Sequence, residues 1–314
     1  MSGGVPGSTI TLIGNVNADL IVRDASELPP PGEEWTIDAV TLRPGGAAAN
    51  CGLASAALGE APRVVASVGG DRIGAVLLEE LAAGGVATGD VRVEEDQATG
   101  VSIAFEAPGR DRSFLTSQGC LATFEASMVP DDALTARFVL LGGYFLLPML
   151  RGADGAAGLL RTARANGAVT CFDPGWDPSG WPASTRDELA AILPLVDVLL
   201  PNAGEAAGIT GSDGPREAAR KLQALLAPGG WAVVKLGRDG CVAAGPGGAE
   251  AASPAPAATV IDSTGAGDAF NAGLLAAMAA GADVPGALGF AVRVASAVIG
   301  RPSHDRYPAI AELA

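Results

Sequence analysis

The chain has 314 residues, 48% of them hydrophobic, and a formal net charge of −15. An acidic surface disfavours nucleic acid as a partner, because the phosphate backbone would be repelled. The most apolar stretch, Val139–Leu150, is shorter than the roughly 18–20 residues that a membrane-spanning helix needs. The N-terminus has no signal-like segment, so we expect one cytoplasmic domain over residues 1–314 with no membrane partner.

The first part of the chain predicts strands and two helices. Gly45–Leu58 has helical composition, and Asp71 is placed to cap a second helix that runs through Leu81. Apolar β-rich runs predict three strands, at Thr9–Gly14, Leu20–Val22 and Arg63–Val68.

Three further runs predict strands that stand outside a regular alternation of strand and helix. Glu34–Leu42 alternates loosely, as a half-exposed strand would, while Thr99–Glu106 and Arg112–Thr116 flank a turn at Pro108-Gly109. Strands of this kind can form a separate flap beside a main sheet.

From Phe138 onward, strands and helices alternate. The predicted strands are Phe138–Leu141, Ala168–Phe172, Val196–Leu200 and Trp231–Leu236; the predicted helices are Gly152–Asn166, Arg186–Leu193, Pro215–Leu226, one within Ala266–Ala280, and Val284–Val298. This alternation predicts an α/β fold with a mostly parallel sheet covered on both faces. Ligands of such sheets lie beyond the carboxyl ends of the strands.

The segment Asp262–Asn271 is the strongest functional signal. Its residues Gly265, Ala266 and Gly267 open an Ala-rich helix, where free backbone amides and the helix dipole form an anion site. A carboxylate there, Asp268, is useful as a base that takes a proton while the amides hold a phosphoryl group. The segment therefore predicts a kinase; the alternative is an ordinary glycine-rich helix start.

The same segment resembles the C-terminal signature of the ribokinase-like (PfkB) sugar kinases, Asp-Thr-x-Gly-Ala-Gly-Asp-x-Phe, with Ser263 in a place where that family often has Thr. The resemblance extends from about residue 10 to residue 300. It implies a three-layer α/β/α sandwich and a small β-strand lid, here at approximately residues 32–45 and 98–117. It also implies ATP and Mg²⁺ as cofactors and Thr264 at the nucleotide. The resemblance leaves open whether the protein needs a monovalent cation and whether it forms a homodimer through the lid.

Asn17 and Asp19 follow the first strand two residues apart, so that they can face the same side and bind a polyhydroxylated ligand. Taken alone they also fit a polar turn. Gly45-Gly46-Ala47-Ala48-Ala49-Asn50 resembles the family's N-terminal signature. By that resemblance Asn17, Asp19, Gly46 and Asn50 contact the acceptor sugar.

Asn202 and Glu205 have the spacing of a helix capping box, which explains them without a ligand. In the family an Asn-x-x-Glu motif at this place helps to hold magnesium, largely through water, as is usual for this ion. Both roles are compatible.

Lys235-Leu236-Gly237-Arg238-Asp239-Gly240 joins two strands. A similar Leu-Gly-x-x-Gly of the family lies against the nucleotide, which implies contacts from Gly237 and Gly240. Lys235 either reaches a phosphate or is only a polar residue at a strand end. Asp173 resembles a family residue that lines the cleft between the two substrates.

One departure concerns the acceptor. The ribokinase subgroup has an acidic residue where this chain has Gly142-Gly143-Tyr144-Phe145, so an aromatic ring could stack on the acceptor there. Few basic residues lie in the acceptor segments, so an acceptor that is uncharged or nearly so is expected. Arg43, Arg110 and Arg112 are the exceptions, and they keep an acidic sugar open as the minority alternative.

We therefore expect an ATP-dependent kinase that phosphorylates a hydroxymethyl group of a sugar or sugar-like alcohol. The alternatives are a nucleoside kinase of the same fold and a non-catalytic nucleotide or sugar sensor. Asp268 argues against the sensor, because binding alone gains nothing from a carboxylate beside a phosphate.

Overall fold

The computed structural model describes residues 8–23, 29–105, 113–152, 154–302 and 305–313. Among these residues, a nine-stranded sheet has the order β13-β12-β11-β10-β9-β8-β1-β4-β5. Its strands are β1 (Ile10–Gly14), β4 (Arg63–Gly69), β5 (Ala87–Glu94), β8 (Phe138–Gly142), β9 (Val169–Asp173), β10 (Val198–Leu199), β11 (Trp231–Lys235), β12 (Cys241–Ala244) and β13 (Glu250–Ser253). All neighbours pair in parallel except β12, which is antiparallel to β11 and β13.

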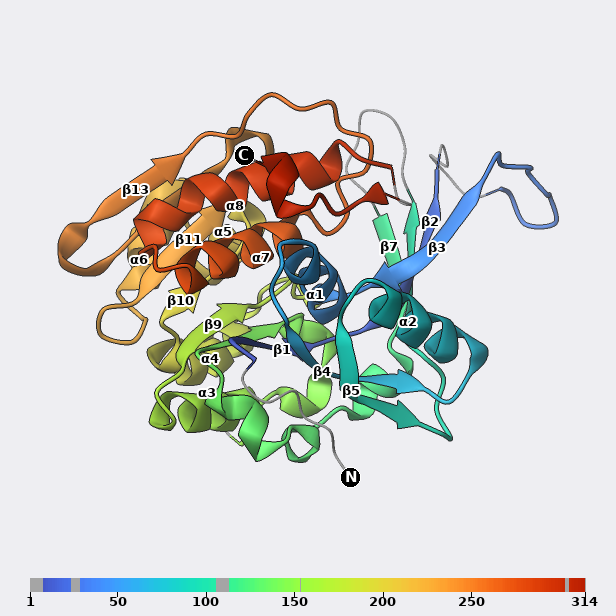
Figure 1. The fold of residues 1–314 in the computed structure, drawn as a ribbon, viewed down its shortest axis with the longest axis horizontal. Helices are drawn as coiled ribbons and strands as arrows, with labels where there is room; N and C mark the ends of the chain where they lie inside the picture. The colour runs from blue at the N-terminus through green and yellow to red at the C-terminus, as the bar shows by residue number, and fades with distance from the viewer. Residues whose placement is uncertain (1–7, 24–28, 106–112, 153, 303–304, 314) are drawn as a thin grey trace.

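Helices cover both faces of this sheet and give three layers (Figure 1). One face carries α1 (Ala47–Ala57), α2 (Arg72–Ala83), α7 (Ala266–Ala279) and α8 (Val284–Ile299). The other carries α3 (Ala156–Ala165), α4 (Ala183–Ile192), α5 (Ala203–Thr210) and α6 (Pro215–Gln223). The expected three-layer α/β/α sandwich with a mostly parallel sheet is confirmed.

Small residues set the spacing of the helices around α7. A Cβ atom added at Gly273 would lie 2.9 Å from Cγ2 of Val294 and 3.0 Å from Cα of Ala291, so only glycine lets α7 and α8 approach this closely. Much of the Ala- and Gly-rich composition of α1, α7 and α8 is explained by such packing.

A second, four-stranded sheet, here called the small sheet, has the order β3-β2-β6-β7. It consists of β2 (Asn17–Val22), β3 (Val40–Gly45), β6 (Val101–Phe105) and β7 (Ser113–Ser117). Its labelled strands β2, β3 and β7 lie at the opposite side of the molecule from β11 and β13 (Figure 1). The two expected lid segments, 32–45 and 98–117, contribute β3, β6 and β7, and β2 joins them from outside those segments.

Other boundaries differ from the sequence expectation. The strand expected at Glu34–Leu42 begins only at Val40, and the residues before it are irregular. The helix expected from Gly152 begins at Ala156, and the strand expected at Val196–Leu200 is limited to Val198–Leu199. Strands β5 and β13 were not predicted; both carry exposed polar or small residues that weaken the β pattern. Glu106 and Arg112, expected at strand ends, lie outside the described residues.

The strand order places the site. From β1 the chain continues to β4 on one side, whereas β8 pairs with β1 on the other, so the connections diverge between β1 and β8. In open α/β sheets the crevice beyond the carboxyl ends at such a point is where ligands bind. In the described part of the chain no helix is long and apolar enough to cross a membrane.

Candidate active site

Helix α7 begins at the residues predicted to form the anion site. Gly265 precedes the helix with φ 71° and ψ 8°, a left-handed conformation that favours glycine. The first-turn amides of an α-helix have no carbonyl partner within the helix. Of the three predicted amides, that of Ala266 donates to the Ser263 carbonyl at 3.3 Å, a long bond that an incoming anion can replace.

Asp268 lies in the first turn of α7, and Asn50 of α1 orients its carboxylate. The Asn50 Nδ2 donates to Asp268 Oδ2 at 3.0 Å, and the Tyr307 hydroxyl donates to Asn50 Oδ1 at 3.1 Å. Burial, and then the negative charge of Asp173, raise the pKa of Asp268 to about 8, against the opposing effects of Lys235 and Asn50. A carboxyl group with a pKa near neutrality is suited to exchange protons.

Lys235 reaches the same place from the end of β11. Its Nζ lies 2.6 Å from Asp173 Oδ2, which also accepts from Asn271 Nδ2 at 2.6 Å. A Cβ atom added at Gly267 would lie 3.3 Å from Lys235 Nζ, so the ammonium group adjoins the first turn of α7. Burial alone would lower the pKa of Lys235, but Asp173 and Glu205 outweigh it and hold that pKa above its ordinary value. Lys235 is therefore a cation at the anion site.

Asn202 and Glu205 form the complete capping box of α5. The Asn202 backbone amide donates to Glu205 Oε2 at 2.8 Å, and the Glu205 amide donates to Asn202 Oδ1 at 2.9 Å. The side-chain Nδ2 of Asn202 also donates to Glu205 Oε1 at 2.7 Å. Glu205 is only 5% exposed, and burial together with the charge of Asp173 raises its pKa well above the ordinary value.

Asn17 and Asp19 lie on β2 in a chain of side-chain hydrogen bonds. Asn15 Nδ2 donates to Asn17 Oδ1 at 2.7 Å, and Asn17 Nδ2 donates to Asp19 Oδ1 at 2.9 Å. A Cβ atom at Gly45 would fall on the Asp19 carboxyl group, and one at Gly46 would lie 2.4 Å from the Asn15 carbonyl oxygen. The two glycines therefore make room for this polar chain. Burial raises the pKa of Asp19 to about 6 against the effect of Arg43.

Asp262 ties three distant segments together just before α7. Its Oδ2 accepts from Arg43 of β3 at 2.7 Å and from Arg306 at 3.0 Å. Its Oδ1 accepts a hydrogen bond from the backbone amide of Thr264 at 2.9 Å. Thr264 was expected to contact the nucleotide, and its backbone amide is engaged in this local hydrogen bond instead.

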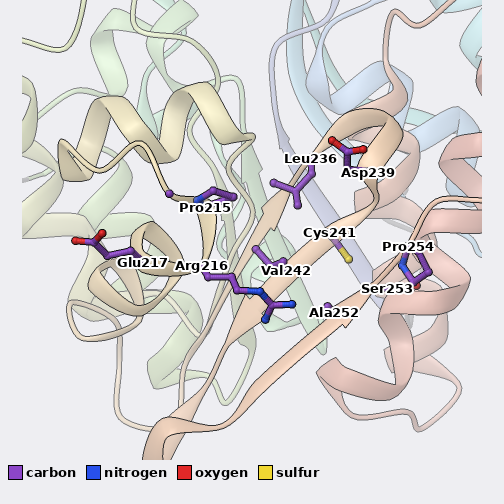
Figure 2. A pocket seen from close by; sticks show the side chains of 11 residues that line it. Pro215, Arg216, Glu217, Leu236, Asp239, Cys241, Val242, Ala252, Ser253 and Pro254 are labelled. Atoms are coloured by element: carbon purple, nitrogen blue, oxygen red, sulfur yellow. The ribbon is translucent and has the colours of Figure 1, made fainter.

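A cavity of about 590 Å³ lies beside the turn that contains Gly237 and Gly240 (Figure 2). Both glycines have positive φ, 59° and 86°. The wall of the cavity comes from the start of α6 and from β12 and β13: it is lined by Gly214, Pro215, Arg216, Glu217, Leu236, Asp239, Cys241, Val242, Ala252, Ser253 and Pro254. This volume suits a small ligand.

The aromatic residue expected to stack on the acceptor does not reach it. Tyr144 is fully buried, its hydroxyl donates to Glu188, and its ring packs edge-on against Phe172. The turn before it is occupied by Gly143, at φ 68°, where a Cβ atom would lie 2.0 Å from Asn15 Oδ1. Gly143 therefore supports the Asn15 chain and sends Tyr144 into the core. Arg110 and Arg112 lie outside the described residues.

The structure brings the predicted residues of α7, α1, β2, β11 and α5 to one end of the sheet. It also adds residues that were not predicted for the site: Asn271, Asp262, Arg306 and Tyr307. Asp262 and Asn271 belong to the segment Asp262–Asn271 but were given no role of their own. Arg306 and Tyr307 lie in no recognisable motif, and Tyr307 is separated from Asn50 by more than 250 positions. Within the described residues no cluster of three or more His, Cys, Asp or Glu side chains has the arrangement of a metal cage.

Comparison with known proteins defines the class of this protein. A family model described as pfkB family carbohydrate kinase matches residues 8–308. The chain belongs to this family, and it is an ATP-binding kinase by that membership. A ribokinase of Haemophilus influenzae is 27% identical over 275 residues, which cover 86% of this chain and 85% of that protein.

Solved structures agree on the fold. The ribokinase of Arabidopsis thaliana, complexed with ribose and ATP, superposes with a TM-score of 0.83 at 24% identity, covering 98% of both chains. A putative ribokinase II of E. coli, in complex with ATP and Mg²⁺, gives a TM-score of 0.81 at 23% identity, covering 98% of this chain and 97% of the other. The ribokinase-like fold is thereby shown.

Proposed function

We propose that the protein transfers the γ-phosphoryl group of ATP to a hydroxymethyl group of a sugar or sugar-like alcohol, with Asp268 as the general base. The observation that carries this proposal is a carboxyl group of raised pKa in the first turn of α7, held by Asn50 beside the cation of Lys235. A helix start with only a structural role would not need a carboxyl group of raised pKa beside a cation.

In the proposed step the acceptor oxygen attacks the γ-phosphorus while its proton passes to the Asp268 carboxylate. The bond between the γ-phosphorus and the β,γ-bridging oxygen breaks, and ADP leaves with the electron pair. The hydrogen bond from Asn50 leaves Asp268 Oδ1 free to accept that proton. In phosphoryl transfer, positioning and electrostatic stabilisation supply most of the rate.

The amides of Gly265, Ala266 and Gly267 would hold the phosphoryl oxygens, and Lys235 would offset their charge. Lys235 is kept in place by Asp173, which is in turn held by Asn271. Closure of the small sheet over the acceptor would exclude water and limit hydrolysis of ATP.

Asn202 and Glu205 would hold magnesium through water. Oxygen donors suited to magnesium are present, because the buried carboxylates of Glu205 and Asp173 lie close enough to influence one another electrostatically. Magnesium keeps several waters and uses few protein ligands. When bound it would neutralise the phosphates and orient them for transfer. A requirement for a monovalent cation stays a prediction.

The nucleoside end of ATP would extend along the Gly237–Gly240 turn toward the cavity of Figure 2. The acceptor would lie on the other side of Asp268, against Asn17, Asp19 and the turn at Gly46. A homodimer through the small sheet stays a proposal, supported by the exposed side chains of Leu42, Phe114 and Leu115. We also propose that the protein is cytoplasmic.

Acceptor-dependent formation of ADP tests the proposal. Purified protein is incubated with Mg·ATP and a panel of pentoses, hexoses, ketoses, aldonates, sugar phosphates and nucleosides, and the product is analysed for a new phosphate ester. A sugar-type acceptor should accelerate ADP formation strongly. If only nucleosides accelerate ADP formation, the enzyme is a nucleoside kinase. If no compound of the panel accelerates it, the result favours the non-catalytic sensor.

A further inference from the structure

Arg43 and Arg306 form an unusual pair of buried cations. Their side chains are 8% and 2% exposed, and both donate Nη1 to the same oxygen of Asp262, whose side chain is fully buried. Arg43 comes from the small sheet and Arg306 from the segment after α8, so the pair exists only in the folded chain.

Each guanidinium group keeps one edge unused. Nε and Nη2 of both Arg43 and Arg306 are buried and have no hydrogen-bond partner. In arginine these two nitrogens form the edge that grips a carboxylate or phosphate with two parallel bonds. Leaving such charged donors unpaired in a protein interior is costly, and buried polar groups are generally satisfied. Two free forks on guanidinium groups that share one Asp262 oxygen therefore indicate a missing oxyanion.

The neighbouring carboxylate does not fill this place. Asp19 lies opposite Arg43 in the pairing of β2 with β3, and its Oδ1 accepts from Asn17. The positive charges of Arg43 and Arg306 both act to lower the pKa of Asp19, so the pair lies near the proposed acceptor contacts.

The arginine pair lies on the acceptor side of the base. Arg306 precedes Tyr307 and stands 5.9 Å from the centre of its ring. Tyr307 is linked through Asn50 to Asp268 by two hydrogen bonds. Lys235 and Asp173 approach Asp268 from the ends of β11 and β9 instead. The free forks and the phosphate site are thus separate.

We infer that the acceptor carries an oxyanion, either the carboxylate of a sugar acid or the phosphate ester of a sugar phosphate, bound by the Nε–Nη2 edges of Arg43 and Arg306. The inference rests on the proposed function and makes the two arginines its specificity-determining residues. It favours the acidic acceptor that the sequence kept open through Arg43 over the uncharged one, and it adds Arg306, of which the sequence expectation took no account. Because the free nitrogens have no access to solvent, Arg43 must separate from Asp262 for the ligand to enter.

The test compares acceptors with matched carbon skeletons: a neutral sugar, its aldonate and its monophosphate. For the wild-type protein we expect kcat/KM for the better anionic acceptor to exceed that for the neutral sugar by about 100-fold, as two charge-assisted forks would give. Whether the aldonate or the monophosphate is favoured identifies the oxyanion.

Arg306→Lys keeps the charge beside Asp262 but removes the fork. It should lower the ratio of anionic to neutral kcat/KM by roughly 10- to 100-fold. Arg301→Lys is the matched control: Arg301 is nearby in sequence and pairs with Asp305 and Glu312 at the surface, so the ratio should not change.

A direct binding measurement covers the case in which the variant does not fold. Wild-type protein without ATP should bind the preferred anionic acceptor in calorimetry and bind the neutral sugar at least tenfold more weakly. Equal use of neutral and anionic acceptors by the wild type would overturn the inference and leave the proposed function intact. Absence of acceptor-dependent ADP formation with the whole panel would instead remove the proposed function.

Discussion

The two halves of the site are built in different ways. On the side proposed for the nucleotide, Asp173, Asn202 and Lys235 stand at or just after the carboxyl ends of three adjacent strands, β9, β10 and β11. On the acceptor side, Asp19, Arg43, Asn50 and Arg306 come from two strands of the small sheet, a helix and the C-terminal segment. The first half is fixed by the sheet itself, whereas the second depends on contacts between segments far apart in the chain.

The two halves have different tasks: one binds phosphates, which is a general task, and the other recognises a particular acceptor. Holding phosphates requires amides and a cation at a helix start, which the sheet can supply in one fixed arrangement. Recognising an acceptor requires interchangeable side chains on elements that can open and close. Asp268 lies where the halves meet, and changes on either side of it should have separable effects.

Among changes confined to one half of the site, the largest effect should come from the proposed nucleotide side. Lys235→Met removes the cation at the first turn of α7, and we expect kcat to fall by about 10²–10³-fold, as for loss of one preorganised electrostatic group. The change also leaves Asp173 without its ion pair, so the double variant Lys235→Met/Asp173→Asn is the control for stability. Recovery of activity in the double variant would show that Lys235 only neutralises Asp173.

Asp19→Ala should act on the acceptor alone. A lost hydrogen bond to an ionised group is worth about 1.5–3 kcal/mol, or roughly 10- to 100-fold in acceptor affinity. Steady-state kinetics with each substrate varied in turn should show a raised acceptor KM and an unchanged KM for ATP. The opposite pattern would mean that the two halves have been assigned the wrong way round.

Glu205→Gln should raise the magnesium concentration for half-maximal rate by about tenfold, because polar groups around the metal waters tune metal affinity to this extent. Glu79→Gln, at an exposed position of α2 away from the proposed site, is the control. A lower melting temperature with unchanged magnesium dependence would leave Glu205 as a helix cap only.

The smallest effect concerns the support of the base. Tyr307→Phe removes the hydroxyl that holds Asn50, and a neutral hydrogen bond is worth about 0.5–1.5 kcal/mol, so kcat should fall by roughly 2- to 10-fold with little change in either KM. The chain has one other tyrosine, Tyr144, which is buried in the core on the far face of the sheet. Tyr144→Phe should change stability and leave the pH dependence of kcat as it is.

The sequence predicted most of the main sheet and the start of α7, because apolar strands and glycine-rich helix starts are local patterns. Its nucleotide-site residues stay a prediction. It assigned Asn50 only to the acceptor, whereas in the structure its amide holds Asp268. Arg306 and Tyr307 follow no pattern in the chain, since their roles arise from contacts with residues more than 40 and 250 positions away. Tyr144 was placed wrongly because the positive φ of Gly143, which turns the chain inward, is not visible in the residue order.

The central claim is that Asp268 takes the proton from the acceptor. Its pKa is raised to about 8, and only the ionised form can accept a proton, so kcat/KM for the acceptor at saturating Mg·ATP should rise with pH across the range below that value. Asp268→Asn keeps the shape of the side chain and removes the base.

The decisive measurement is the turnover of Asp268→Asn across pH 5–9 beside Asp283→Asn, which changes a helix cap remote from the site. We predict that Asp268→Asn lowers kcat by roughly two to four powers of ten, removes the rise with pH and retains ATP binding. Turnover of Asp268→Asn within about threefold of the wild type, or an unchanged pH profile, would contradict the assignment.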